Sequence, residues 1–367
     1  MTDQEVYDRT LDEPAMPGPS VSSQPASSRP DEAYYRRAPE PRPARRANGL
    51  GVALVLVGML LLAFQLFGRG AGFGSAGSLT LADKTLPGNR IELSAAASDV
   101  EVRPWDGSGI HVEATQHGGS RGDYTVDIVP AGDTVRVTES SSSFFCLFCS
   151  RSVSYRISVP RGAQADIHTA SGEIDVAGLS GAVSLASVSG DIHANDLSTG
   201  LKVSTTSGEV QLDNIAGKLD VGSISGDVEL EDGKVNDVTV NTTSGRVDLD
   251  GVSGPLNLTS VSGDITVRDS RDGQLHLSTT SGGIEYAGSL ARGSTNELNS
   301  ISGDVKLRLP GDSSFRLDAS TVSGDLSSDF DLRQRQSGRG ALGGVAGDGS
   351  ATLTIGTTSD EIAVERE

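Results

Sequence analysis

The sequence predicts an all-β protein whose largest part is a parallel β-solenoid. A Ser-Gly pair recurs at spacings of 18, 18, 18, 19, 18, 19, 21 and 21 residues. Self-similarity at a fixed short period is typical of stacked units rather than of one globular core. The composition agrees, because 46 Gly and only 4% aromatic residues suit short strands joined by frequent turns. The pairs lie at Ser171-Gly172, Ser189-Gly190, Ser207-Gly208, Ser225-Gly226, Ser244-Gly245, Ser262-Gly263, Ser281-Gly282, Ser302-Gly303 and Ser323-Gly324.

The N-terminal region differs from the repeats. Residues 1–49 are rich in Pro, Ser, Ala and Arg and have no apolar periodicity. Such a segment cannot bury enough apolar surface to offset the entropy lost on ordering. We predict a disordered tail here.

Residues 50–67 form an apolar run that contains no charge and one polar side chain, Gln65. At a rise of ~1.5 Å per residue this helix would be about 27 Å long, enough to span the hydrocarbon core of a bilayer. A cleaved signal peptide is the alternative, but its leader would be far shorter than the 49 residues found here. We predict one retained transmembrane helix.

The basic residues around this run set its orientation. Arg42, Arg45 and Arg46 precede it closely, and only Arg69 follows closely. The positive-inside rule therefore places the N-terminus in the cytoplasm and the rest of the chain outside the cell or in the periplasm. Residues 68–78 are Gly-rich and predict a flexible linker.

Residues 79–160 do not follow the Ser-Gly period, yet they alternate apolar and polar residues as strands do. We predict an irregular β cap, because a stacked array needs an atypical end unit to shield its first open face. Ser98 and Asp99 resemble a degenerate repeat turn within it.

Two cysteines, Cys146 and Cys149, lie in a Phe-rich segment of this region. Outside the membrane, two nearby thiols favour a local disulfide across a loop tip. A thioredoxin-like redox site is an alternative, although the neighbours are strand formers. The aromatic cluster is also a candidate hydrophobic tip. A zinc site needs four ligands, and the chain has no second Cys pair.

The solenoid is expected over residues 161–367, and its repeats alternate between two forms. The residues before Ser-Gly are Thr-Thr in one repeat, as at Thr205 and Thr206, and Ser followed by Val or Ile in the next. One coil holds either two repeats or one. Two repeats per coil would place Val188 beside Ile224, whereas one repeat per coil would place Val188 beside Thr206.

The end of the chain is irregular. Residues 331–350 are rich in Gly, Arg and Ser, and we predict a flexible loop there. Residues 351–364 restate the repeat without its Gly, which predicts a terminal coil.

Four aliphatic residues precede the Ser-Gly pair in alternate repeats. If they point outward they form a candidate docking stripe, and if they point inward they are core residues. These residues are Val188, Ile224, Val261 and Ile301.

The repeat resembles that of the bacterial family of adhesins built of β-strand repeats, labelled DUF4097. The resemblance rests on Ser-Gly-Asp/Glu-Ile/Val at this spacing and on Val-Pro-Arg-Gly at 159–162. Residues 309–317 and 321–330 are similar to the family's closing pattern, so the resemblance covers roughly 90–367. It implies an exported or membrane-anchored β-repeat protein, in some members linked to envelope-stress sensing, with no catalytic residues to carry over. The long tail and the Cys-x-x-Cys segment depart from the simplest members.

Several function classes fit the sequence poorly. A formal charge of −19 argues against nucleic acid as a partner. The five His are scattered, and turn chemistry explains the recurring Asp and Glu beside Gly, which argues against catalysis. One Asp per ~18 residues supplies too few oxygens for calcium. Residues 161–367 have three aromatic side chains, Tyr286, Phe315 and Phe330, which weakens the case for carbohydrate adhesion.

We therefore expect a single-pass cell-membrane protein that acts by binding or adhesion, or as an envelope scaffold, without catalysis or a cofactor. The expected partners are the lipid bilayer, through residues 50–67, and another envelope or surface protein. The main alternative is an envelope-stress sensor that signals inward through its tail. A polysaccharide-active β-helix enzyme is a further alternative.

Overall fold

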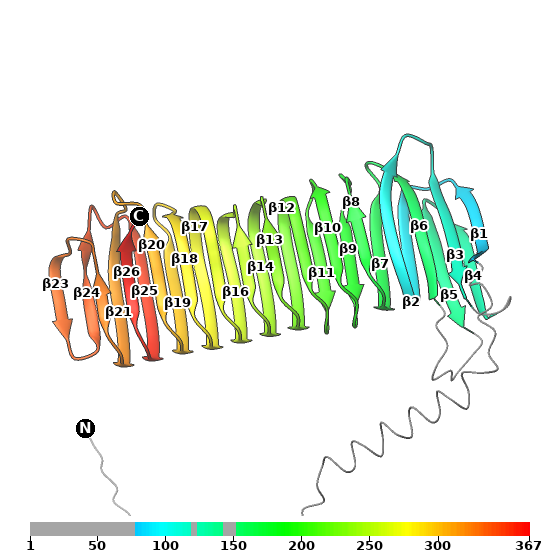
Figure 1. The fold of residues 1–367 in the computed structure, drawn as a ribbon. Coiled ribbons are helices and arrows are strands. Elements are labelled where there is room, and N and C mark those ends of the chain that lie inside the picture. The colour runs from blue at the N-terminus through cyan, green and yellow to red at the C-terminus, as the bar shows by residue number, and fades with distance from the viewer. Residues whose placement is uncertain (1–77, 119–122, 142–151) are drawn as a thin grey trace, which may run out of the picture. The chain divides into compact units, whose positions relative to one another are not determined.

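The computed structural model describes residues 78–118, 123–141 and 152–367, and every regular element in them is a β-strand (Figure 1). The chain divides into two units, residues 1–72 and 73–367, and all described residues belong to the second. The predicted tail, transmembrane helix and linker up to residue 77, and both cysteines, lie outside the described residues. Within the described ranges no helix is long and apolar enough to cross a membrane.

Each coil contributes one strand to each of two parallel sheets, A and B. In one coil, β9 (Val183–Ser187) lies in sheet B, the chain turns at the Ser-Gly corner, and β10 (Ile192–Leu197) lies in sheet A. A second turn leads to β11 (Leu201–Thr205), which pairs in register with β9. One repeat is therefore one coil.

This register decides between the two predicted arrangements. The backbone N–H of Ser207 donates to the carbonyl oxygen of Val188 at 2.9 Å, and Thr205 pairs with Ser187. Val188 therefore lies beside Thr206, so the arrangement with one repeat per coil is confirmed and the one with two is wrong.

The central coils continue along the stack. Strands β12 and β17 run from sheet A into sheet B without a break in their strand assignment. The strands are β12 (Val210–Ser225), β13 (Val228–Glu231), β14 (Lys234–Ser244), β15 (Val247–Asp250), β16 (Ser253–Ser262), β17 (Ile265–Ser281), β18 (Ile284–Leu290), β19 (Thr295–Ser302) and β20 (Val305–Leu309).

The core lies between the two sheets. Burial alternates along the strands of the central coils, as in β11, where Leu201 and Val203 are buried and Lys202 is exposed. No coil could bury its apolar face alone, and stacking joins these faces into one continuous core.

At the N-terminal end the stacking order departs from the chain order. Strand β2 lies between the coil of β5 and β6 and the coil of β7 and β8, so part of the predicted cap is a regular coil (Figure 1). Strands β1, β3 and β4 complete this end as antiparallel strands. The strands are β1 (Ser78–Leu86), β2 (Arg90–Trp105), β3 (Ile110–His117), β4 (Tyr124–Ala131), β5 (Thr134–Ser141), β6 (Ser152–Pro160), β7 (Gln164–Ser171) and β8 (Ile174–Ala177).

The C-terminal end of the solenoid also has antiparallel strands and a coil inserted out of chain order. The predicted flexible loop at 331–350 is wrong, because β23 (Arg333–Gly338) and β24 (Ala341–Ala346) form a hairpin there. It pairs antiparallel with β21 (Phe315–Ser323) and covers that edge of sheet B.

The predicted terminal coil is a coil, but it is not the last in the stack. Strand β25 (Ala351–Ser359) lies between β19 and β21, and β26 (Ile362–Arg366) lies between β20 and β22 (Leu326–Ser328). In Figure 1 these two red strands are inserted among the orange and yellow ones. A local repeat pattern identifies a coil but carries no information on its place in the stack.

Candidate functional site

The glycines of the Ser-Gly corner are required by the close approach of successive coils. A Cβ on Gly226 would collide with the carbonyl oxygen of Gly208, and a Cβ on Gly208 with that of Gly190. Only a residue without a side chain fits there. The predicted corner residues are therefore structural, and the column of glycines leaves a strip without side chains along the corner.

A column of hydroxyl groups lies just inside the corner. Ser187 is buried and its Oγ accepts the backbone N–H of Gly190 at 2.8 Å. Ser223 is also buried and donates to the carbonyl oxygen of Gly226 at 3.2 Å. These bonds stabilise the turn from within. The column consists of Thr169, Ser187, Thr205, Ser223, Thr242, Ser260, Thr279, Ser300, Thr357 and Thr321.

Aspartates after the glycine join the coils in pairs. The Oδ1 of Asp191 accepts the backbone N–H of Glu209 at 3.0 Å, and that of Asp227 accepts the N–H of Arg246 at 2.7 Å. Asp99, Asp264 and Asp304 make the same bond to the next coil. This bond gives a physical reason for an Asp in every second coil.

The side chains of the candidate docking stripe point outward. Val188, Ile224, Val261 and Ile301 are 51%, 52%, 48% and 53% exposed, so the alternative that they are core residues is wrong. Val322, which the sequence analysis missed, belongs to the same column and is 82% exposed. We call these five residues the corner stripe.

The corner stripe accounts for nearly all exposed large aliphatic side chains. Six such residues occur in the described part of the chain, and five of them form the stripe; the sixth is Val129. Scattered single apolar residues on a surface need no explanation, but five in one column do.

The inserted C-terminal coil preserves the alternation of this column. Ile301 and Val322 come from consecutive Ser-Gly repeats and would be adjacent if the coils followed the chain order. The coil of β25 lies between them and places Thr358 there. Aliphatic residues therefore alternate with Thr206, Thr243, Thr280 and Thr358. Because parallel strands lie about 4.8 Å apart, the aliphatic side chains recur about every 9.6 Å.

The two faces beside the stripe differ in charge. The outer face of sheet A is acidic on balance: Asp175, Asp213, Glu229, Glu231, Asp248, Asp250 and Glu285 outnumber Arg268, Lys306 and Arg308. The outer face of sheet B is largely neutral, with Ser184, Ser204, Thr239, Asn241, Asn257, Thr259 and Ser278 among its side chains. The stripe therefore runs between an acidic and a nearly neutral face.

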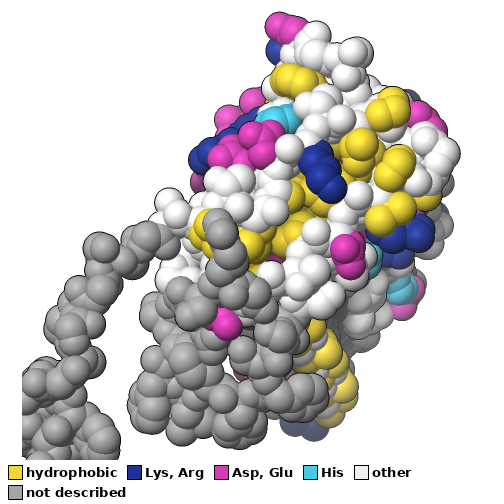
Figure 2. All heavy atoms as spheres, turned by 90° about the vertical axis from the view of Figure 1, so that its right-hand side faces the viewer, with side chains coloured by type: hydrophobic (Ala, Val, Ile, Leu, Met, Phe, Trp, Pro, Cys, Tyr) yellow, Lys and Arg dark blue, Asp and Glu magenta, His cyan; other side chains and the backbone are white. Residues whose placement is uncertain are grey.

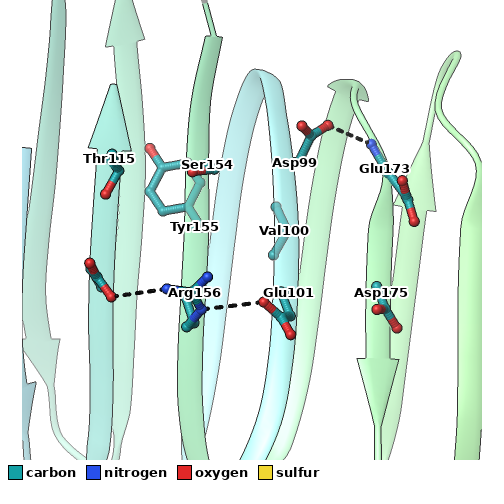
Figure 3. A pocket seen from close by; sticks show the side chains of 10 residues that line it. Asp99, Val100, Glu101, Thr115, Ser154, Tyr155, Arg156, Glu173 and Asp175 are labelled. Atoms are coloured by element: carbon teal, nitrogen blue, oxygen red, sulfur yellow. Dashed lines mark hydrogen bonds and ion pairs between the residues drawn. The ribbon is translucent and has the colours of Figure 1, made fainter. Parts of the chain in front are cut away.

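A hollow of about 220 Å³ lies on the sheet A face near the N-terminal end (Figure 3). Arg156 bridges Glu101 and Glu113, each at 3.4 Å. The Oδ1 of Asp99 accepts the N–H of Glu173 at 3.1 Å. The carboxylates of this hollow therefore serve ion pairs and a backbone bond.

A neighbouring ion pair also belongs to this face. Arg103 pairs with Asp175, and this hydrogen bond raises the pKa of the guanidinium. The guanidinium therefore stays charged and holds neighbouring coils together.

A larger hollow of about 820 Å³ lies along the second turn. Its lining includes Asp196, Asp213, Asp232, Asp250 and Asp269. The described residues contain no cluster of three or more His, Cys, Asp or Glu arranged to hold a metal ion.

A buried polar cluster lies inside the N-terminal coils. Ser98 and Tyr155 both donate to the Oε2 of Glu139, and both are only 1% exposed. Burial raises the pKa of Tyr155 far above its usual value, and the charge of Glu139 raises it further. Ser98 and Tyr155 are therefore almost fully shielded from solvent, whereas Glu139 is only partly buried.

The N-terminal end of the solenoid is a second surface with apolar side chains. Figure 2 shows them gathered among charged residues on the end formed by β1, β3 and β4. Leu81, Leu86 and Val126 pack partly buried against the core there, and Val129 is 54% exposed.

Cys146 and Cys149 lie outside the described residues, so their disulfide stays a prediction.

A family model described as Toastrack DUF4097 matches residues 88–289 and 291–365, well over half of the chain. The chain belongs to the Toastrack DUF4097 family. The sequence resemblance is confirmed, and its β-strand repeats are the coils of the solenoid. No curated protein matches the chain.

Two solved structures are similar to this DUF4097 chain. One is "a putative cell adhesion protein from Clostridium sporogenes", with 10% identity and a TM-score of 0.24; the match covers 80% of this chain and 100% of that chain. The other is "a putative adhesin from Parabacteroides merdae", with 11% identity and a TM-score of 0.26; the match covers 80% of this chain and 98% of that chain.

Proposed function

We propose that this DUF4097 protein is a membrane-anchored, surface-presented β-solenoid that acts by binding, without catalysis. The corner stripe carries the proposal, because it gathers five exposed aliphatic side chains in one column between the polar outer faces of the two sheets. Exposed apolar columns of this kind mark contact surfaces. The adhesin descriptions of the two similar structures agree with a binding role.

The proposed anchor is the apolar segment at residues 50–67, with the N-terminus in the cytoplasm. An acidic exported domain supports presentation away from the bilayer, because its charge repels anionic headgroups and favours solubility.

Cell fractionation tests the anchor. The full chain should sediment with membranes, and Lys202 and Lys218, both exposed, should react with a membrane-impermeant amine reagent on intact cells. If the chain is found in the soluble fraction, or reacts only after lysis, the proposed location is wrong.

Site-specific photo-cross-linking tests the binding surface. A photo-reactive amino acid at Ile224 should give a discrete cross-linked product in intact cells, while the same group at Glu229 of the same coil, on the sheet A face, should not. Equal products from both positions, or none from any stripe position, would refute binding at the stripe.

A further inference from the structure

The corner stripe has a regular spacing that any partner must match. Its aliphatic side chains recur at every second coil, about every 9.6 Å, over about 40 Å from Val188 to Val322. A partner with another period would meet only one or two of them. A second copy of this chain has the same period by construction, so every aliphatic residue can meet its equivalent.

We propose that the occupant of the corner stripe is the stripe of a second, membrane-anchored copy, in a parallel and in-register dimer. In this dimer Ile224 packs against Ile224 of the partner subunit, and Val261 against Val261 of the partner subunit. The proposal rests on the membrane anchorage put forward above.

The contacts between charged faces differ between the parallel and the antiparallel orientation. A two-fold axis parallel to the solenoid places the acidic sheet A face of one copy beside the nearly neutral sheet B face of the other. An antiparallel pair about the stripe would place the two acidic faces side by side. With the aliphatic residues matched about Val261, Asp248 and Asp250 would lie beside Glu285 of the partner subunit, which like-charge repulsion disfavours. Glu229 and Glu231 would lie beside Lys306 and Arg308 of the partner subunit.

The position of the described part in the chain favours the parallel orientation. Strand β1 begins at Ser78, and the ten residues between it and the predicted span, 68–77, reach at most about 36 Å. Both copies therefore start from the same bilayer at their N-terminal ends, which suits a parallel pair.

Anchorage also offsets the small size of the contact. A strip about 40 Å long and one or two side chains wide buries less than the roughly 800 Å² per partner of a standard interface. A dimer of this size is weak in dilute solution. Confinement to one membrane raises the effective concentration and makes association favourable.

Cysteine cross-linking of the full chain in membranes tests this arrangement. In a background with Cys146→Ser and Cys149→Ser, the single substitutions Ile224→Cys, Thr243→Cys and Val261→Cys should each give a disulfide-linked homodimer. An in-register parallel pair brings every stripe position close to its own equivalent. Glu229→Cys on sheet A and Ser204→Cys on sheet B are the controls and should stay monomeric, and thermal melting of each variant checks that the fold is kept.

A variant that removes only the aliphatic character tests the stripe itself. Val188, Ile224, Val261 and Ile301 are each replaced by Thr, the residue that alternate coils already place in this column. The homodimer formed through Thr243→Cys should be lost in this variant.

Three results would overturn the dimer. The first is cross-linking at one stripe position only, which an antiparallel pair would give. The second is equal cross-linking at the control positions. The third is the absence of a homodimer at every stripe position in chains that sediment with membranes. In the last case the anchorage stands and only the dimer fails, whereas a chain absent from the membrane fraction refutes both proposals. A heterologous photo-cross-linked product from Ile224 without a homodimer would leave the binding function in place and refute the second copy as its partner.

Discussion

At the scale of single residues, glycine at the corner and glycine on a strand have opposite roles. Gly226 faces the carbonyl oxygen of Gly208, whereas a Cβ on Gly222, in the same coil, would meet no atom within 4 Å. Gly226→Ala should therefore lower the free energy of unfolding by about 2–3 kcal/mol through overpacking. Gly222→Ala should be neutral or raise it by about 0.5–1 kcal/mol, because Gly weakens a strand.

Urea unfolding of the two variants and the parent measures both effects. Equal stability of Gly226→Ala and Gly222→Ala would contradict close stacking at the corner.

Two buried tyrosines, Tyr155 and Tyr286, lower the stability of the described domain at high pH, because the pKa of each is raised. Burial raises the pKa of Tyr286 to about 12, and its hydroxyl donates to the carbonyl oxygen of Ser289 at 2.8 Å. In the unfolded chain Tyr286 ionises near pH 10, before it does so in the folded chain, and this ionisation stabilises the unfolded state relative to the folded state. The contribution of protonated Tyr286 to the free energy of unfolding is fully present below pH 10. About 2–3 kcal/mol of it is lost as the pH rises to about 12.

Tyr286→Phe should reduce this loss. The measurement is the urea midpoint at pH 8 and pH 11.5 for both chains. The same decrease in parent and variant would show that Tyr286 does not contribute to the loss of stability.

At the scale of elements, both ends of the solenoid are covered by antiparallel strands. The hairpin of β23 and β24 pairs with β21, and the exposed β23 carries Arg333 and Arg335. Charged and covered edges prevent a sheet from pairing with another chain. Replacing residues 333–346 by a Gly-Ser linker of equal length should expose the edge of β21 and cause concentration-dependent association.

Light scattering of detergent-solubilised chains over a range of concentrations measures this association. A control linker of the same composition, inserted at the exposed Gly311, should leave the size unchanged. Unchanged size after loss of the hairpin would show that it does not protect the edge.

The sequence predicts the elements better than their order. The alternation of Thr-Thr with Ser-Val or Ser-Ile is visible in the sequence, and it survives in space as the column from Val188 to Val322. The hairpin was missed because every residue of β23 is exposed, so it has no apolar alternation to detect. The insertions of β2 and of β25 with β26 depend on pairing across the stack, which local sequence does not encode.

At the scale of the whole molecule, the described domain presents different surfaces on different sides. One corner carries the aliphatic stripe, sheet A carries carboxylates, and sheet B carries small neutral side chains. The family and the fold identify a surface built by stacking, and the stripe is the part of it that we propose as the binding surface. The inserted C-terminal coil separates Val322 from Ile301 and so keeps the alternation of that stripe.

The stripe and its proposed role both depend on one repeat forming one coil. With Cys146→Ser and Cys149→Ser, the pair Val188→Cys and Thr206→Cys should form an intramolecular disulfide, because neighbouring strands lie about 4.8 Å apart. The pair Val188→Cys and Ile224→Cys, two coils and about 9.6 Å apart, should stay reduced within one chain. Mass spectrometry of dilute, detergent-solubilised chains distinguishes the two. A disulfide between positions 188 and 224, with 188 and 206 left reduced, would contradict the alternating stack.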